Sequence, residues 1–174
     1  MVSMNLISHI NADGDILQAW LDHYVRLGVT RFHVVLHGPE EENAILLALR
    51  SRYPIEVHEM YGGPFLGREK KLRLDRVLAQ LTDQWLLLVD SDEFLELPVG
   101  SVAAAIRLLE RTGTDALAAP MVQRIRADGT LESPDLVPDP FQEFPLCSWN
   151  LYSLMSVKAP LSEFPSSIAG PAPR

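Results

Sequence analysis

The sequence has only one cysteine, Cys147, and no apolar run long enough to cross a membrane. A lone cysteine forms no intrachain disulfide, which favours a reducing compartment. The strongest apolar run covers residues 85–89, whereas a transmembrane helix needs about 20 residues. The first residues lack a basic region followed by an apolar stretch, so we expect no signal peptide. These absences predict a cytoplasmic protein without a transmembrane segment.

Positive charge is also scarce. The chain has 15 lysines and arginines against 23 aspartates and glutamates, a net charge of −8. Nucleic-acid binding needs a basic surface, so we expect no nucleic-acid partner. Anionic lipid exerts no general attraction on such a chain either. A cluster of carboxylates can still hold a hard cation, and that cation can bind an anion.

Proline is rare in the first two-thirds of the chain. Only four of the 13 prolines lie before residue 120. Proline removes a backbone donor and interrupts regular elements. We therefore expect regular structure up to about residue 125 and an irregular segment over 126–174, with residues 168–174 as a frayed tail. The length, 174 residues, and the hydrophobic content, 47%, suit one globular domain.

The regular part alternates between strand and helix patterns. The predicted strands cover residues 4–10, 32–36, 55–60, 85–89 and 116–122. The predicted helices are one capped by Asp13 and stopped by Gly28, one opened by Glu40–Glu42, one over 66–82, and one over 99–111 closed by Gly113. This order predicts an α/β fold with a mostly parallel sheet flanked by helices. In such folds ligands bind beyond the carboxyl ends of the strands.

Three carboxylates follow the fourth predicted strand, at Asp90, Asp92 and Glu93. In an extended segment Asp90 and Asp92 point the same way. Carboxylate oxygens suit Mg²⁺ and Mn²⁺, so the pattern favours a divalent metal site. The alternative is that Asp92 and Glu93 solvate a turn and cap the next helix.

Two segments carry a family resemblance. Residues 85–95 (WLLLVDSDEFL) resemble the D-x-D-E-F segment of GT-A-type glycosyltransferases, in the family 2-like group that shades into family 92. Residues 11–24 (NADGDILQAWLDHY) resemble the N-E-x-x-x-L-x-E-W-L-x-x-H opening of the same group. The resemblance covers roughly residues 5–125 and preserves the order of the motifs. It implies a GT-A-like, Rossmann-type fold, with a nucleotide-sugar-binding domain over 1–125 and an acceptor-side segment over 126–174.

The resemblance also implies a donor and a metal. The donor is a nucleotide-diphosphate sugar, from which a hexosyl or related group moves to an acceptor hydroxyl. Asp92 holds Mn²⁺ or Mg²⁺ across the two phosphates, and Asp90 contacts the metal, the ribose or the sugar. Asn11 and Asp13 lie near the base and ribose, although a turn or cap role for Asn11 is equally open.

Basic residues crowd the start of the predicted helix over 66–82, namely Arg68, Lys70, Lys71, Arg73 and Arg76. A helix N-terminus favours anions, so this end suits a diphosphate. Arg68 shares a helix face with Lys71, and by resemblance Lys71 and Asp75 match donor-site positions best. The alternative is a solvated face with Glu69 and Asp75 as local partners.

The base that deprotonates the acceptor in an inverting enzyme is sought after the fifth strand. The candidates are Asp135, Asp139 and Glu143, and the sequence does not select among them. The chain also departs from the family, because it lacks the S-x-D-x-T-like loop after strand two and a Gly-x-His element near its end. None of the five histidines shows a zinc-like pairing on one element. We therefore expect structural roles for them, with His23 as a packing residue.

Three functions compete on this sequence. The first is a metal-dependent glycosyltransferase. The second is a non-catalytic GT-A remnant that binds sugar nucleotides. The third is a phosphatase of the haloacid-dehalogenase type, with Asp90 as its nucleophile. The donor base and sugar, the acceptor and the oligomeric state are not determined by the sequence.

Overall fold

The computed structural model describes residues 4–11, 14, 16–82, 84–97, 99–119, 122–127, 140–149 and 167–169. Its helices are α1 (Leu17–Leu27), α2 (Ala44–Leu49), α3 (Gly67–Leu78), α4 (Val102–Thr112) and α5 (Pro140–Glu143). Its strands are β1 (Asn5–Asn11), β2 (Arg31–His37), β3 (Ile55–Tyr61), β4 (Leu86–Leu88), β5 (Ala116–Ala118), β6 (Val122–Ile125), β7 (Leu146–Trp149) and β8 (Ser167–Ala169). The predicted alternation of strands and helices is confirmed from β1 to β5.

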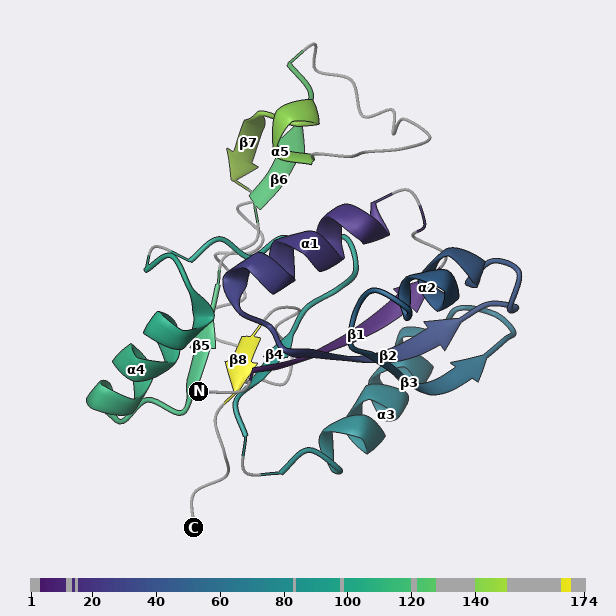
Figure 1. The fold of residues 1–174 in the computed structure, drawn as a ribbon, viewed down its shortest axis with the longest axis horizontal. Coiled ribbons are helices and arrows are strands. Elements are labelled where there is room, and N and C mark those ends of the chain that lie inside the picture. The colour runs from purple at the N-terminus through teal and green to yellow at the C-terminus, as the bar shows by residue number, and fades with distance from the viewer. Residues whose placement is uncertain are drawn as a thin grey trace.

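The main sheet has six strands in the order β3-β2-β1-β4-β8-β5. The pairs β3–β2, β2–β1 and β1–β4 are all parallel. Strand β8 is inserted between β4 and β5 and is antiparallel to both (Figure 1). The α/β fold with a mostly parallel sheet is therefore confirmed.

The end of the chain differs from the sequence-based expectation. Ile168 and Ala169 were expected in a frayed tail but belong to β8, and that expectation was wrong for these two residues. The predicted strand over 116–122 is instead two short strands, β5 in the main sheet and β6 paired with β7 in a second sheet. Local sequence could not reveal β8, because its partners Leu87 and Leu117 lie far away along the chain.

Helices cover both faces of the main sheet. On one face α1, α2 and α4 pack in a large core cluster with the strands, where the Trp20 ring contacts the rings of Tyr24 and Phe32. On the other face Leu74 and Val77 of α3 pack in a smaller cluster. Figure 1 shows α1 and α3 on opposite sides of the strands. This arrangement leaves the carboxyl ends of β1 to β4 along one edge.

Helix ends follow local chemistry at several positions. Gly28 and Gly113 close α1 and α4 in the left-handed region, at φ 103° and 63°, where a Cβ is unfavourable. The Ser101 side chain caps α4 by accepting from the Ala104 amide. At the start of α1, Ile16 takes the N-cap position without a side-chain cap, and Asp13 lies outside the described residues.

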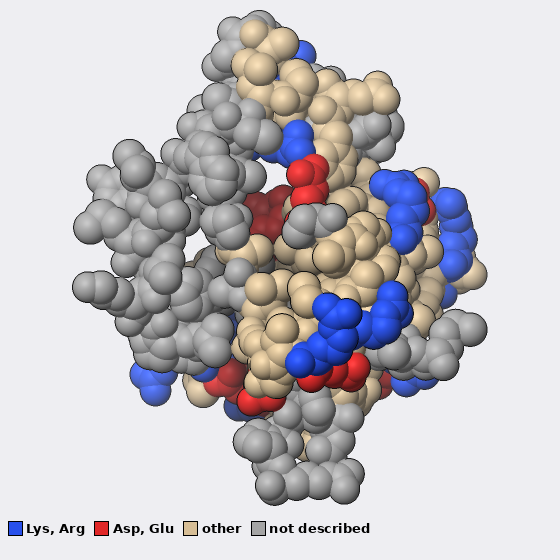
Figure 2. All heavy atoms as spheres, turned by 90° about the vertical axis from the view of Figure 1, so that its left-hand side faces the viewer, with Lys and Arg blue, Asp and Glu red and all other residues tan. Residues whose placement is uncertain are grey.

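Among the described residues, no helix is both long and apolar enough to cross a membrane. On the face drawn in Figure 2, lysine and arginine side chains lie beside aspartate and glutamate side chains. Charges of both signs are therefore mixed on this face, although the chain as a whole carries −8.

Candidate functional site

Polar side chains gather where four parallel strands end. Asn11, His37 and Tyr61 are the last residues of β1, β2 and β3, and they lie opposite one another in the strand register. Asp90 follows two residues after the end of β4. These four residues, together with Lys70 of α3, are called the carboxyl-end site below.

Asp90 and Glu93 close a turn by two reciprocal bonds. The Asp90 amide donates to Glu93 Oε2 at 3.0 Å, and the Glu93 amide donates to the Asp90 carbonyl oxygen at 3.1 Å. The segment from Asp90 to Asp92 is therefore bent rather than extended, unlike the geometry assumed from sequence. A turn role is confirmed for Glu93, while Asp92 is exposed and Asp90 is half-buried.

Side chains of helix α1 hold this turn through hydrogen bonds to the backbone of the turn. Trp20 Nε1 donates to the Asp90 carbonyl oxygen at 3.1 Å. The Tyr24 hydroxyl donates to the Glu93 carbonyl oxygen at 2.9 Å and accepts from the Leu95 amide at 3.0 Å. Trp20 and Tyr24 are fully buried, so a buried helix face fixes the carboxylate-bearing turn. The two sequence motifs that carry the family resemblance are in direct contact here.

His23 makes both packing and polar contacts. Its ring packs against Phe94 and Phe141, with centroids 5.3 and 5.5 Å away. Its Nε2 donates to the Leu95 carbonyl oxygen at 2.9 Å. Burial lowers the pKa of His23 below its ordinary value. A neutral His23 therefore supports the segment that follows Asp90 as well as packing against it.

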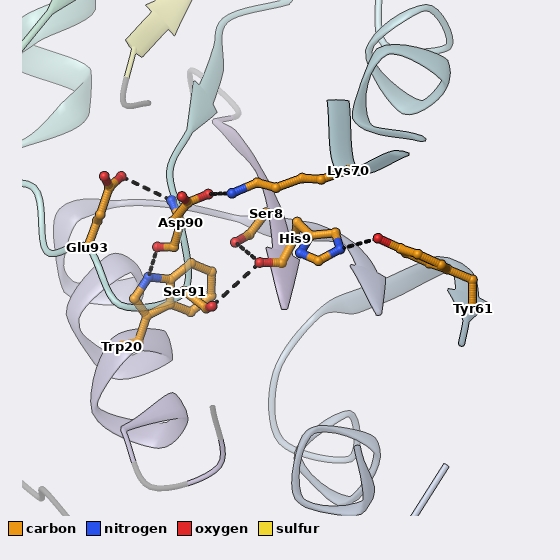
Figure 3. A network of polar contacts seen from close by, with 8 residues as sticks. All are labelled: Ser8, His9, Trp20, Tyr61, Lys70, Asp90, Ser91 and Glu93. Carbon is orange, nitrogen blue, oxygen red and sulfur yellow. Dashed lines mark hydrogen bonds and ion pairs between the residues drawn. The ribbon is translucent and has the colours of Figure 1, made fainter. Parts of the chain in front are cut away.

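A lysine neutralises the first aspartate of the motif. Lys70, in the first turn of α3, places its Nζ 2.6 Å from Asp90 Oδ1. Lys70 and Trp20 approach Asp90 from α3 and α1 respectively (Figure 3). The two side chains of the ion pair are partly shielded from solvent, since Lys70 is 24% and Asp90 34% exposed. This ion pair links α3 directly to the first aspartate of the motif.

The two basic residues of α3 that the sequence favoured as donor contacts, Arg68 and Lys71, form no ion pair with Asp90 among the described residues. Lys71 Nζ pairs with Asp75 Oδ2 at 2.9 Å, and both side chains are exposed. Arg68 is also exposed. Sequence reasoning therefore missed Lys70 as the partner of Asp90. Adjacent lysines differ by about 100° around a helix, and only the tertiary position of α3 decides which one reaches the motif.

His9 lies in β1, two residues before Asn11, and its ring is neutral. Its Nε2 is 2.9 Å from the Tyr61 hydroxyl oxygen, and the Ser91 hydroxyl donates to the His9 carbonyl oxygen at 3.5 Å (Figure 3). Burial, reinforced by the positive charge of Lys70, lowers the pKa of His9 from 6.5 to about 4. The ring therefore adds no positive charge at neutral pH.

Aromatic rings line the β1 to β3 part of this edge. His37 lies 4.9 Å from Tyr61 and 5.8 Å from Phe65 between ring centroids, and His9 is 5.8 Å from Phe65. Phe65 is 51% exposed. His37 Nδ1 also lies 2.6 Å from Asn11 Oδ1. The rings are steeply inclined to one another, and this edge thus offers the exposed ring of Phe65 near the exposed residue Asn11.

Arg73 also faces this group from α3. Its guanidinium stands 3.8 Å above the Tyr61 ring and pairs with Glu59. This contact fixes the tyrosine against the helix, because a guanidinium over an aromatic face is favourable.

The remaining predicted site residues receive no geometric support. Asp13, Asp135 and Asp139 lie outside the described residues. Glu143 is the last residue of α5. The site described here therefore consists of side chains from β1, β2, β3, α3 and the turn after β4.

Comparison with known proteins supports the fold. The chain matches no protein-family model and no curated protein sequence. Among solved structures, residues 1–349 of TarS from S. aureus match with a TM-score of 0.50 and 17% identity over 69% of this chain and 36% of TarS. A 4-diphosphocytidyl-2C-methyl-D-erythritol synthase from Anaerococcus prevotii matches with a TM-score of 0.44 and 12% identity, over 97% of this chain and 70% of that enzyme. The chain spans about a third of the TarS structure, and at this identity the likeness is one of α/β fold.

Proposed function

We propose that this chain is a metal-dependent glycosyltransferase that binds a nucleotide-diphosphate sugar at the carboxyl-end site. The observation that carries the proposal is the turn bearing Asp90 and Asp92, which lies at the carboxyl edge of the sheet beside Lys70 of α3. Ligands of open α/β sheets bind at this edge. The sequence resemblance of the turn to the D-x-D-E-F segment supports the same assignment.

Charge balance favours a divalent cation together with an anion. Asp90 and Asp92 offer carboxylate oxygens, which Mg²⁺ and Mn²⁺ prefer. The Lys70 ammonium lies 2.6 Å from Asp90 Oδ1, which supports a cation position beside this carboxylate. A metal on Asp92 and Asp90 would neutralise the diphosphate and stabilise it as a leaving group.

Lys70 is then the residue expected to contact a phosphate. If a divalent cation were held by Asp90, the Lys70 ammonium would be free to donate to a phosphate oxygen instead of to that carboxylate. The first turn of α3 adds backbone amides that favour an anion, since its N-cap residue, Leu66, provides no side-chain cap.

The nucleoside is proposed to lie along β1 to β3. The exposed ring of Phe65 beside His37 provides a face on which a base can stack. Asn11, hydrogen-bonded to His37, and Asp13 are proposed to contact the base and ribose. Arg68, Lys71 and Asp75 are retained as further donor-contact predictions on α3. The acceptor base is still to be selected from Asp135, Asp139 and Glu143.

Calorimetry tests donor binding directly. The full chain is titrated with UDP-glucose, UDP-N-acetylglucosamine and GDP-mannose, each with Mn²⁺. We expect one donor to bind, with affinity at least about tenfold weaker in Asp92→Asn and Lys70→Gln, since each loses a charged contact to the diphosphate or its metal. Lys71→Gln applies the same test to the neighbouring lysine, which is also a donor-contact prediction. A change below about twofold in Lys71→Gln assigns the phosphate contact to Lys70, and a loss of about tenfold in Lys71→Gln alone assigns it to Lys71.

Two results contradict the proposal. One is that none of the three donors binds, and the other is that binding is indifferent to Asp92→Asn. Release of nucleoside diphosphate from the bound donor separates an enzyme from a binding module. Donor binding without transfer or hydrolysis favours the non-catalytic alternative.

A further inference from the structure

Three metal-ligating side chains converge at the opposite end of β2 and β3. His33 Nδ1 lies 2.8 Å from His58 Nε2. Glu56 Oε2 is 3.6 Å from His33 Nδ1, and Glu56 Oε1 is 3.7 Å from His58 Nε2. All three donor atoms therefore face one another, within 4.8 Å. Sequence patterning did not indicate this group, because its histidines come from two different strands.

The pairing of β2 with β3 places all three ligands on one face of the sheet, next to a shift in the strand register. His33 is opposite Glu56 and Val34 is opposite Val57, but Val35 is opposite Glu59. His58 is thus an extra residue in β3, as in a β-bulge, which redirects a side chain. Its ring centroid lies 5.1 Å from that of His33. Glu56 and His58 are two residues apart in β3, so both side chains point to the same face of the sheet and can meet His33 there.

The environment prepares His33 to be a ligand. Its side chain is 3% exposed, whereas that of Glu56 is 51% exposed. Burial lowers the pKa of His33, and the nearby Glu56 carboxylate only partly opposes this. A neutral imidazole is the form that binds a metal. The group therefore combines a fixed neutral ligand with an exposed carboxylate that can turn toward an ion.

The distances suit a small tetrahedral ion. Zinc bonds of about 2.0–2.1 Å place tetrahedral ligand atoms about 3.3 Å apart. The two carboxylate distances, 3.6 and 3.7 Å, are near this value. The two histidine nitrogens, at 2.8 Å, are at hydrogen-bond distance and must separate slightly when a metal replaces the shared proton.

We propose that His33, Glu56 and His58 form a Zn²⁺ site with a fourth position open to water. Two imidazoles and one carboxylate suit zinc, unlike the carboxylate pair of Asp90 and Asp92, which suits Mg²⁺ or Mn²⁺. His33 lies four residues before the end of β2, about 13 Å from the carboxyl edge at the usual strand rise. The site is therefore separate from the proposed donor site and does not depend on it.

One feature limits the affinity of this site. With a metal on Nδ1, the remaining proton of His33 sits on Nε2. That nitrogen is buried and has no hydrogen-bond partner among the described residues. Zinc-binding histidines usually donate this proton to an outer partner, which strengthens the site. We therefore expect weaker binding than in a site whose outer contacts are complete.

Calorimetry with Zn²⁺ alone, without nucleotide, tests the proposal on the full chain. We expect one equivalent to bind, and excess Mg²⁺ should not displace it. His58→Ala and Glu56→Gln should each weaken binding by at least about tenfold, since even outer contacts of a metal site contribute about 10–100-fold. Glu56→Gln changes an exposed side chain, so its effect is independent of any loss of folding in His58→Ala.

Asp92→Asn is the matched control, because it removes the other proposed metal ligand. We expect its Zn²⁺ affinity to stay within about twofold of the wild-type value, since its site lies far from His33. Co²⁺ in place of Zn²⁺ should give the intense visible absorption of a four-coordinate site, and His58→Ala should lose it. The proposal is overturned if the wild type binds no Zn²⁺, or if Asp92→Asn abolishes binding. It is also overturned if Glu56→Gln and His58→Ala both bind Zn²⁺ as tightly as the wild type does. Failure of donor binding would leave these outcomes unchanged.

Discussion

At the residue scale, Trp20, His23 and Tyr24 lie on the buried face of α1 although each carries a polar group. A helix that only packed against the sheet would need apolar side chains there. Instead, these residues satisfy backbone groups of the turn that bears Asp90. Buried backbone groups must be paired, so each polar side chain replaces water that the core excludes. The position of the carboxylates therefore depends on residues that carry no charge.

Tyr24→Phe tests this dependence. The substitution keeps the ring but leaves the Glu93 carbonyl and the Leu95 amide without their shared partner. We expect the free energy of unfolding to fall by about 1–3 kcal/mol, the cost of buried groups left unpaired. Urea denaturation measures the change. Tyr53→Phe is the control, since its hydroxyl donates only to the Asp22 carboxylate, and an equal loss in both variants would contradict the assigned role.

His9 predicts a pH dependence of stability. In the unfolded chain His9 takes up a proton near pH 6.5, whereas its folded pKa is about 4. Between these values the unfolded state binds more protons, so stability falls as the pH is lowered from about 6.5 toward 4. The stability that depends on a neutral His9 is therefore fully present above pH 6.5 and is lost as the pH falls toward 4.

Urea unfolding at several pH values measures this slope. His9→Gln removes the titrating group, so its free energy of unfolding should fall less steeply with decreasing pH than that of the wild type. A residual slope is expected, because burial also lowers the pKa of His23 and of His33. Identical slopes in the two proteins would show that His9 does not contribute.

At the scale of elements, what could be predicted depended on whether the signal was local. The apolar periodicity and Gly28 gave α1 to within a few residues, and the strands from β1 to β4 followed from short β-rich runs. The carboxylates after β4 were also found, because the motif is contiguous. Lys70 and the pair of His33 and His58 were missed. Their partners lie on other elements, and the bulge in β3 depends on pairing with β2.

At the scale of the whole molecule, the sheet is completed by a segment near the end of the sequence. β8 lies between β4 and β5 and hydrogen-bonds to both. Without it, β4 would present an unpaired edge next to the turn that carries Asp90, and exposed edges are unfavourable. The segment after residue 125 was predicted to serve the acceptor side of the same domain, and β8 gives part of that segment a direct role in the sheet beneath the proposed donor site.

Ile168→Pro tests whether this strand supports the fold. Ile168 is the central residue of β8 and is opposite Leu87 in β4 and Leu117 in β5. Proline removes a backbone donor from an internal ladder, so we expect the free energy of unfolding to fall by at least about 2 kcal/mol. Ile168→Val keeps the amide and should cost less than about 1.5 kcal/mol. Urea denaturation distinguishes the two variants. If both match the wild type, the segment behaves as the frayed tail that its sequence suggested, and β4 is stabilised by β1 alone.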